Sequence, residues 1–339
     1  MVNSSGVHPP HSRPSTKTLQ RVAAATLAVP LLLLSAACGS DDEAAPAPVA
    51  SVSGKPGQQP KITASKGAKA PDQVVAKTVT EGKGATVHKD DFVRLDFAYQ
   101  TLDGQAIGST WSAQARTKGK SASPQLVGQA TNKSTSLVNP GGVFQKLVGQ
   151  KVGSRVEVEG TAKTFYGEQM ASQVGLKPTQ GLVFVADIKA SKKVDPKATV
   201  TGKQAAPESG LPTVKADGQK AATITVPKGE KAPGDLKQQT LIHGKGPEVK
   251  AGQALVVQYT GVKWEDGKTF DSSWKNGGAT GFQIGTGSVI KGWDQGLVGK
   301  HVGDRVLLVI PPKLGYGDQA QSGLSKNTLV FSVDILAAF

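Results

Sequence analysis

The C-terminal part of the chain carries aromatic and acidic residues whose side chains could contact a ligand, and six of them are considered first. They are Tyr259, Phe270, Asp271, Trp293, Tyr316 and Phe331. Packing alone explains each of them singly, because rings on strands or a helix anchor cores and an acid before serines starts turns. The same side chains can also offer apolar surface to a ligand, and tyrosine and aspartate can hydrogen-bond to one. We therefore treat them as candidates for apolar contact and hydrogen bonding.

Other site chemistries find little support in the 339 residues. A single cysteine excludes an internal disulfide framework and a thiolate metal cage, and the five histidines form no ligand pattern, so we expect no metal. The stretch 261–269 ends in Gly-Lys-Thr, but its glycines are one residue too far apart for a phosphate loop and no long helix follows. We therefore expect no cofactor.

Short strands must position the candidate residues. Segments 223–226, 238–243, 255–262, 305–310 and 328–336 are rich in β-branched residues and bounded by Gly, Pro or Asp. Leu255, Val257 and Tyr259 share one face, as in a sheet with one buried side. Only 293–298 is suited to a helix, bounded by Gly292 and Gly299. The sequence predicts an α+β domain, with an antiparallel sheet around one short helix.

The same pattern occurs twice in the chain. Ile62 recurs as Ile224, and Gly82-Lys83-Gly84 recurs as Gly244-Lys245-Gly246, 162 residues later. Towards the end of each copy the spacing falls to about 150, as Tyr166-Gly167 recurs as Tyr316-Gly317. Ordered matches over so long a period indicate two duplicated domains. The change in spacing predicts an insertion of about 13 residues in the first copy, within 117–139.

The domain boundaries follow from the repeat and from composition. We expect a signal segment at 1–38, a flexible tether at 39–60, a first domain at 61–192, a linker at 193–221 and a second domain at 222–339. The tether is rich in Ala, Pro, Ser and Gly and the linker in Lys, Ala, Pro and Gly, compositions typical of flexible connections.

The second copy resembles an FKBP-type peptidyl-prolyl isomerase. The resemblance rests on motifs that keep the family's order and spacing: Val257-Gln258-Tyr259-Thr260-Gly261, Phe270-Asp271-Ser272-Ser273, Phe282-Gln283-Ile284-Gly285, Val289-Ile290-Lys291-Gly292-Trp293, Gly303-Asp304-Arg305, Leu314-Gly315-Tyr316-Gly317 and Leu329-Val330-Phe331. It implies that both copies are FKBP-like domains. Thr280 and the segment 323–327 depart from the family pattern, which bears on substrate preference.

The resemblance also implies a site. Tyr259, Phe270, Asp271, Val289, Ile290, Trp293, Tyr316 and Phe331 would line one apolar cleft, with Trp293 as its floor. The ring of a substrate proline would sit on Trp293, beside Val289, Ile290 and Phe331. Tyr316 would donate its hydroxyl hydrogen to a substrate carbonyl, and Asp271 would orient Tyr259. A dry cleft would favour the twisted amide over the planar one, without any covalent intermediate.

The first copy has lost part of this set. Tyr166 and Phe184 remain, but Phe97 stands at Tyr259, Ile107 at Phe270, Gly108 at Asp271 and Val143 at Trp293. We therefore expect the first domain to be catalytically poor. It could act as a spacer, or as a module that holds client proteins.

The N-terminus is typical of an export signal. Arg13, Lys17 and Arg21 precede an apolar stretch at 22–34, which as a helix would rise only about 20 Å and so fall short of spanning a bilayer. The stretch ends in Ser35-Ala36-Ala37-Cys38, which resembles a bacterial lipoprotein box. We expect Cys38 to carry a lipid at the outer face of the cytoplasmic membrane; ordinary secretory cleavage is the alternative.

The sequence thus predicts an exported, lipid-anchored isomerase that acts on proline-containing polypeptides as a monomer. A macrolide is the class of inhibitor implied for the same cleft. The formal net charge of +14 falls to +11 once residues 1–37 are removed, but basic residues do not alternate with aromatics, so we expect no nucleic-acid partner. The competing function is a lipoprotein that only binds proline-containing partners, without catalysis.

Overall fold

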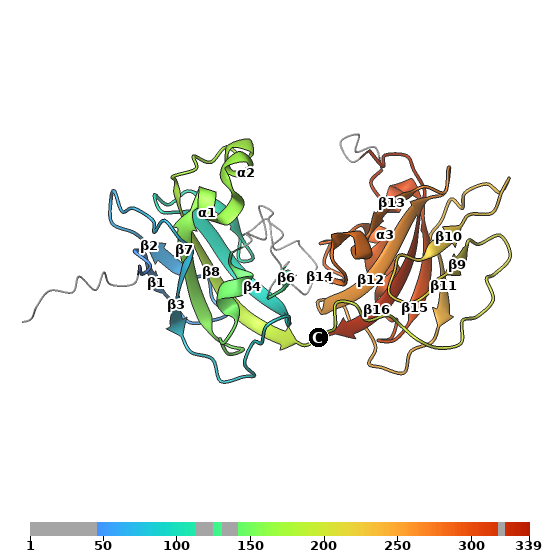
Figure 1. Cartoon of the computed structure of the whole chain (residues 1–339), viewed down its shortest axis with the longest axis horizontal. Coiled ribbons are helices and arrows are strands. Elements are labelled where there is room, and N and C mark those ends of the chain that lie inside the picture. The colour runs from blue at the N-terminus through green and yellow to red at the C-terminus, as the bar shows by residue number, and fades with distance from the viewer. Residues whose placement is uncertain (1–45, 113–124, 131–141, 318–322) are drawn as a thin grey trace, which may run out of the picture. The chain divides into compact units, whose positions relative to one another are not determined.

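A computed structural model describes residues 46–112, 125–130, 142–317 and 323–339. The predicted signal segment, Cys38 and most of the predicted insertion lie outside the described residues. No helix within the described ranges is long and apolar enough to span a bilayer. Figure 1 shows two sheet-based domains along the chain.

The C-terminal domain is built on one antiparallel sheet. Its path runs β11 (Lys237–Ile242), β15 (Arg305–Ile310), β16 (Leu329–Ala338), β12 (Ala254–Lys263) and β13 (Thr269–Ser272), and β14 (Thr280–Gln283) pairs with the other half of β12. The short helix α3 (Lys291–Leu297) packs against β15, and two single turns, η2 (Ser273–Asn276) and η3 (Pro312–Leu314), flank the sheet. The predicted α+β architecture is confirmed.

Two glycines let α3 lie close to the sheet. A Cβ atom at Gly292 would come within 2.5 Å of the Ile310 side chain, and one at Gly296 within 2.6 Å of Leu308. The close approach places Trp293, which lies between them in the chain, in the core beside β12 and β16. Small residues on the helix thus determine the depth at which its large residue is held.

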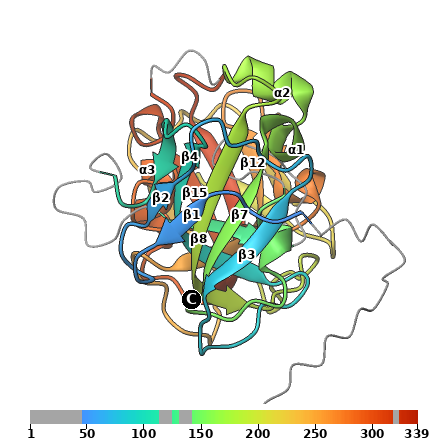
Figure 2. The same ribbon diagram turned by 90° about the vertical axis from the view of Figure 1, so that its left-hand side faces the viewer.

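The N-terminal domain repeats this sheet. Its path runs β3 (Val75–Thr80), β7 (Arg155–Thr161), β8 (Gly181–Lys192), β4 (Phe92–Thr101) and β5 (Ala106–Ser109), and β6 (Leu126–Gln129) pairs with the other half of β4. The helical elements differ: the turn η1 (Phe144–Leu147) stands where α3 is expected, and α1 (Ala162–Tyr166) and α2 (Glu168–Gln173) lie together at one end of β7 (Figure 2).

Each domain also has a two-stranded hairpin on the outer face of its sheet. In the N-terminal domain β1 (Ser51–Ser53) pairs with β2 (Lys61–Thr63) and lies over β8, where it covers Val183 and Val185 (Figure 2). In the C-terminal domain β9 (Thr213–Lys215) pairs with β10 (Thr223–Thr225) and covers Leu307, Val309 and Val330. These hairpins include parts of the segments that the sequence predicted to be tether and linker.

A buried ion pair ties each sheet to the chain before it. Arg155 and Asp187 form one pair, at 2.7 Å, and Arg305 and Asp334 form the other, at 2.6 Å. Arg155 also donates to the carbonyls of Gly54 and Gln58, while the Asp334 carboxylate accepts the Val200 backbone N–H at 3.0 Å. Because buried charges need several partners, these contacts hold the preceding segments in place.

Candidate functional site

All eight residues predicted to line a cleft in the C-terminal domain do so. The cleft has a volume of about 870 Å³. Its lining includes Tyr259, Phe270, Asp271, Val289, Ile290, Trp293, Tyr316 and Phe331. These side chains come from β12, β13, α3 and β16 and from the two loops that follow β14 and η3. The tertiary structure thus brings together residues spread over more than seventy positions in the sequence.

Trp293 forms an aromatic floor. Its ring meets Tyr259 edge-on, with the two ring centroids 5.3 Å apart, and Phe331 edge-on at 5.1 Å. Phe282 packs against it from a third side, also at 5.1 Å. Only 5 % of Trp293 is exposed. Contacts with three other rings favour one orientation of the indole and give the cleft an apolar floor.

One wall of the cleft carries a partly buried hydrogen-bonded pair. The Tyr259 hydroxyl donates to the Asp271 carboxylate, which also accepts the Ser272 backbone N–H at 2.7 Å. Burial, and then the hydrogen bond to Asp271, raises the pKa of the Tyr259 hydroxyl well above its ordinary value. The phenol therefore stays protonated and points its hydrogen at Asp271, which fixes the orientation of both side chains.

The loop before α3 is held by a single carboxylate. Asp294 accepts the backbone N–H of Gly285 at 2.6 Å and that of Gly287 at 2.7 Å. The Ile290 carbonyl in turn accepts the Trp293 N–H at 2.9 Å and so begins the helix. These bonds place Val289 and Ile290 at the edge of the Trp293 floor without contributions from their own side chains.

Tyr316 supplies a hydroxyl that is available for a ligand. It lies between Gly315 and Gly317, and the turn is closed by a bond from the Gly317 N–H to the Pro312 carbonyl at 2.8 Å. Its side chain is partly exposed in the cleft. Within the described residues no hydrogen-bond partner of its hydroxyl is found, so the hydroxyl can donate to a carbonyl of a bound peptide.

Two residues of the site were not identified from the sequence. Phe282 stands in a quoted motif and supports the floor, but only the ring contact with Trp293 reveals its role. Gly261 lies under the aromatic cluster: a Cβ there would come within 2.7 Å of the Phe270 ring and 2.8 Å of the Phe331 ring. Its place in the Tyr-Thr-Gly motif was the available signal. The glycine is needed because two rings occupy the space of its side chain.

Strand register identifies the corresponding residues of the N-terminal domain. Phe331 pairs with Gly261 across the sheet, and Phe184 pairs with Tyr99, so Tyr99 takes the place of Gly261. By the same reasoning Gly108 takes the place of Asp271, as the sequence repeat had predicted. Gly128, opposite Val93, takes the place of Phe282.

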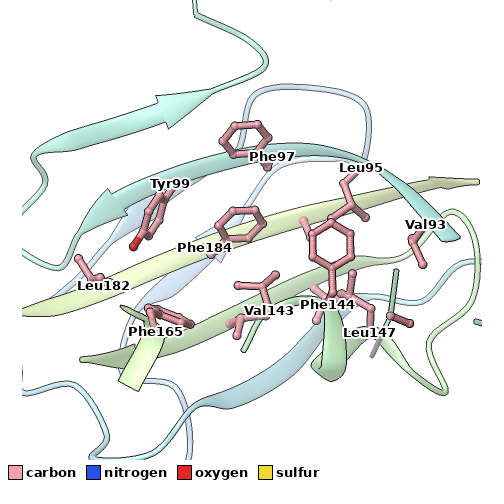
Figure 3. Close-up of a cluster of buried hydrophobic side chains, with 14 of the residues drawn as sticks. Val93, Leu95, Phe97, Tyr99, Val143, Phe144, Leu147, Phe165, Leu182 and Phe184 are labelled. Atoms are coloured by element: carbon pink, nitrogen blue, oxygen red, sulfur yellow. The ribbon is translucent and has the colours of Figure 1, made fainter. Parts of the chain in front are cut away.

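Large side chains fill the space that forms the cleft in the other domain. Figure 3 shows Tyr99, Phe144 and Phe184 together in one cluster, and each is at least 98 % buried. Phe144 lies directly on Gly128, whose absent side chain leaves room for the ring. Val143, at the position of Trp293, is fully buried beneath them.

Tyr166, the counterpart of Tyr316, does not offer a free hydroxyl. It is 5 % exposed and its ring lies 6.4 Å from that of Tyr99, with which its hydroxyl interacts. Burial raises the pKa of the Tyr166 hydroxyl to about 12. The tyrosine is therefore part of the core of the N-terminal domain.

The described residues contain no group of three or more His, Cys, Asp or Glu side chains able to hold a metal ion. The cleft is lined by rings, aliphatic side chains and a few polar groups. Such a lining suits an apolar ligand that is oriented by one or two hydrogen bonds.

Comparison with known proteins identifies relatives of the C-terminal domain. Residues 246–336 match the family model for the FKBP-type peptidyl-prolyl cis-trans isomerase. The FK506-binding protein of Streptomyces anulatus is 43 % identical over 117 residues, which are 34 % of this chain and 94 % of that protein. The probable FK506-binding protein of Corynebacterium glutamicum is 41 % identical over 108 residues, 32 % of this chain and 90 % of that protein.

A solved structure is also similar to part of the chain. The crystal structure of FkpA from Escherichia coli has 38 % sequence identity to the matched region, which covers 33 % of this chain and 52 % of FkpA, with a TM-score of 0.29.

Proposed function

Because this chain belongs to the FKBP-type peptidyl-prolyl cis-trans isomerase family, we propose that its C-terminal domain catalyses the isomerisation of Xaa-Pro bonds in exported proteins and so assists their folding. The observation that supports this most is the open cleft over Trp293, in which all eight predicted residues meet. We propose that proline-containing segments bind there, and that a macrolide would compete for the same space.

The proposed mechanism is non-covalent. Rotation about an Xaa-Pro bond faces a barrier of about 18–20 kcal/mol, because twisting removes the resonance of the amide. Water stabilises the planar, charge-separated amide more than the twisted one. A cleft that excludes water therefore lowers the barrier, and an acceleration of about a thousandfold needs only about 4 kcal/mol of differential binding.

Each residue has a defined part in this mechanism. The proline ring lies on Trp293 between Val289, Ile290 and Phe331, which keep water away. Tyr316 donates its free hydroxyl to the carbonyl of the residue before proline or of a neighbouring residue. Asp271 holds Tyr259 in place through their hydrogen bond and stabilises the partial charges of the rotating amide.

A peptide assay tests the proposal. We expect the full chain to accelerate exchange of a Phe-Pro or Leu-Pro peptide, and we expect a macrolide to abolish the acceleration. Trp293→Ala should lower the rate strongly while the protein remains folded. An uncatalysed rate combined with saturable peptide binding would favour the alternative of a proline-binding or chaperone lipoprotein without catalysis.

We propose that the N-terminal domain is not an isomerase, because Tyr99 and Phe144 occupy the space of the cleft. It would act as a spacer or a client-holding module. Refolding of a protein with a slow proline step distinguishes the two roles. A holding module should lower the apparent Michaelis constant of the full chain for protein substrates but not for peptides, compared with a variant that lacks the domain.

We also propose that the protein is exported and anchored by a lipid on Cys38. The support is the sequence pattern alone: basic residues, a short apolar stretch and a small-residue segment that ends in the only cysteine of the chain. Labelled fatty acid should be incorporated into the wild type and not into Cys38→Ala. Labelling that persists in the variant would contradict the anchor.

A further inference from the structure

We propose that Gln258 is a positioning residue that fastens one wall of the cleft to the chain segment entering the C-terminal domain, at Pro196. This inference rests on the proposed isomerase site, because it concerns how that site is kept in shape. It gives part of the segment between the domains a role in substrate binding.

The contact centres on one backbone carbonyl. The Pro196 carbonyl accepts a hydrogen bond from the Gln258 side-chain amide at 2.7 Å and another from the Ala279 backbone N–H at 2.8 Å. The two donors belong to different elements: Gln258 lies on β12, and Ala279 lies just before β14. One acceptor therefore joins the incoming chain to both elements.

Gln258 connects this carbonyl to the site. Only 2 % of its surface is exposed, and its side-chain oxygen accepts a hydrogen bond from the Ser273 hydroxyl. The Ser273 oxygen in turn accepts the Tyr259 backbone N–H at 3.0 Å. Because Tyr259 contacts both Trp293 and Asp271, the amide of Gln258 lies two hydrogen bonds away from the cleft.

The second donor, the Ala279 N–H, directly precedes a wall of the cleft in the sequence. Ala279 is followed by Thr280, Gly281 and Phe282, all of which line the cleft. Gly278 passes so close to Pro196 that a Cβ atom there would come within 2.2 Å of the same carbonyl oxygen. Pro196 and this loop are therefore in close contact, and we expect the wall to loosen when the contact is lost.

The N-terminal domain has a counterpart of the hydrogen bond between Ser273 and Tyr259, but it has no counterpart of the Gln258 donor. Thr110 takes the place of Ser273 and accepts the Phe97 backbone N–H at 3.1 Å. Asp96 takes the place of Gln258, but its carboxylate accepts from Gln125 and pairs with Lys189. A carboxylate cannot donate to a backbone carbonyl. The domain with a filled interior thus lacks the donor that fastens the wall in the domain with a cleft.

Replacing Gln258 by methionine in the full chain tests the proposal. Methionine has a similar size but cannot donate to Pro196. We expect KM and the Kd for a Leu-Pro peptide to rise about three- to tenfold, with kcat changed less than about twofold. Amide hydrogen exchange at Ala279 should become about tenfold faster, while the amides of β16 keep their protection.

Gln239→Met is the matched control. Gln239 also donates its side-chain amide to a carbonyl of the preceding segment, that of Ala206 at 2.9 Å, but it lies on β11 and does not line the cleft. This variant should leave KM, Kd and the exchange at Ala279 unchanged. Equal effects of the two variants would overturn the proposal, because general loosening of the segment would then explain them.

A second variant approaches the contact from the other side. Gly278→Ala keeps Gln258 but pushes against the Pro196 carbonyl and strains a backbone held at φ +126°, and it should raise the peptide Kd in the same direction as Gln258→Met. Faster exchange at Ala279 without any change in Kd would overturn the positioning role. If the wild type binds the peptide without turning it over, the isomerase function fails, and the Kd and exchange measurements still decide the role of Gln258.

Discussion

The two domains share one strand order, but one holds an open cleft where side chains fill the interior of the other. In the C-terminal domain, Gly261 and Trp293 leave an open cleft of about 870 Å³ above a flat ring. In the N-terminal domain, Tyr99 and Val143 stand at those positions and are at least 98 % buried (Figure 3). The strand order alone therefore does not decide whether such a domain has a site.

The residue differences between the two domain interiors compensate one another in side-chain volume. Where the C-terminal domain has a large floor residue and a large neighbour, Trp293 and Phe282, the N-terminal domain has Val143 and Gly128, and Phe144 takes up the released space. Cores tolerate such combined substitutions when the total volume is kept. A duplicated domain can thus lose a binding site and remain well packed, because filling a cleft adds buried apolar surface.

The largest effect is expected when Trp293 is replaced by valine, the residue at the corresponding position of the N-terminal domain. Trp293→Val should lower kcat/KM for an Xaa-Pro peptide about a hundredfold, which corresponds to about 3 kcal/mol of transition-state stabilisation. The reason is the loss of the flat apolar surface under the proline. A peptide assay at matched concentrations of folded protein measures it.

Trp264→Val serves as the control for this prediction. Trp264 is 6 % exposed and belongs to the cluster on the outer face of the same sheet, away from the cleft. Its loss should lower stability and leave the kcat/KM of the folded protein unchanged. A similar loss of activity in both variants would mean that the floor has no special role.

The outer faces of the two sheets differ in their buried acidic residues, and we therefore expect them to respond differently to pH. Glu157 and Glu159 are buried on β7, where the C-terminal domain has Leu307 and Val309. Burial, and then the neighbouring Glu159, raises the pKa of Glu157 to about 7, while Lys77 on β3 opposes the shift. The two oxygens of Glu159 accept the N–H groups of Val49 and Ala50.

Because the folded-state pKa of Glu157 exceeds the unfolded value, the folded domain binds the proton more tightly. The contribution of Glu157 to the stability of the N-terminal domain should therefore be fully present below about pH 4.5 and be lost as the pH rises through about 7, by at most about 3 kcal/mol. Urea unfolding followed by amide exchange in each domain measures this. Glu157→Gln should flatten the dependence, and a slope that survives the substitution would assign it to other groups.

A smaller effect is expected from narrowing the cleft. Gly261→Ala places a methyl group against the Phe270 and Phe331 rings, a first step towards the tyrosine of the other domain. We expect kcat/KM to fall about tenfold, since overpacking of this kind costs about 1–3 kcal/mol. Peptide turnover together with thermal unfolding measures the two consequences. Unchanged turnover would show that the rings can move aside.

The smallest effect is expected from the tyrosine hydroxyls. Tyr316→Phe removes a free donor and should lower kcat/KM about fivefold, in line with one hydrogen bond of about 1 kcal/mol. Tyr166→Phe, the equivalent change in the N-terminal domain, should leave peptide turnover unchanged. Any loss of turnover in Tyr166→Phe would show that the N-terminal domain contributes to catalysis.

The sequence predicted the repeated strands well because they carry strong local patterns. The segment 305–310 is a strand over the predicted residues, and α3 includes Trp293 as expected. The strands β13 and β14 were not predicted, because each has only four residues. Each of them pairs with a different half of β12. So short a segment has too little periodicity to identify it.

The hairpins show a second kind of difficulty. Residues 51–60 and 213–221 carry few apolar side chains and many turn residues, which is typical of a connection, whereas 223–226 was predicted as a strand and contains β10. The structure shows them as covers over apolar positions such as Val185 and Val309. Val185 lies more than a hundred residues from β1, and Val309 lies more than eighty residues from β10, so local composition could not reveal these covering contacts.

The sequence by itself determined that the chain contains two related domains, because a repeat is a property of residue type and spacing. Through its resemblance to a known family it also indicated which aromatic residues would form the candidate site. Only the tertiary structure decided that Tyr99 fills one domain, that Gly261 keeps the other open, and that Pro196 and Gln258 support its wall. The physical reason is that a cavity is space left between side chains from distant segments. Its existence depends on how those segments pack, which no local pattern specifies.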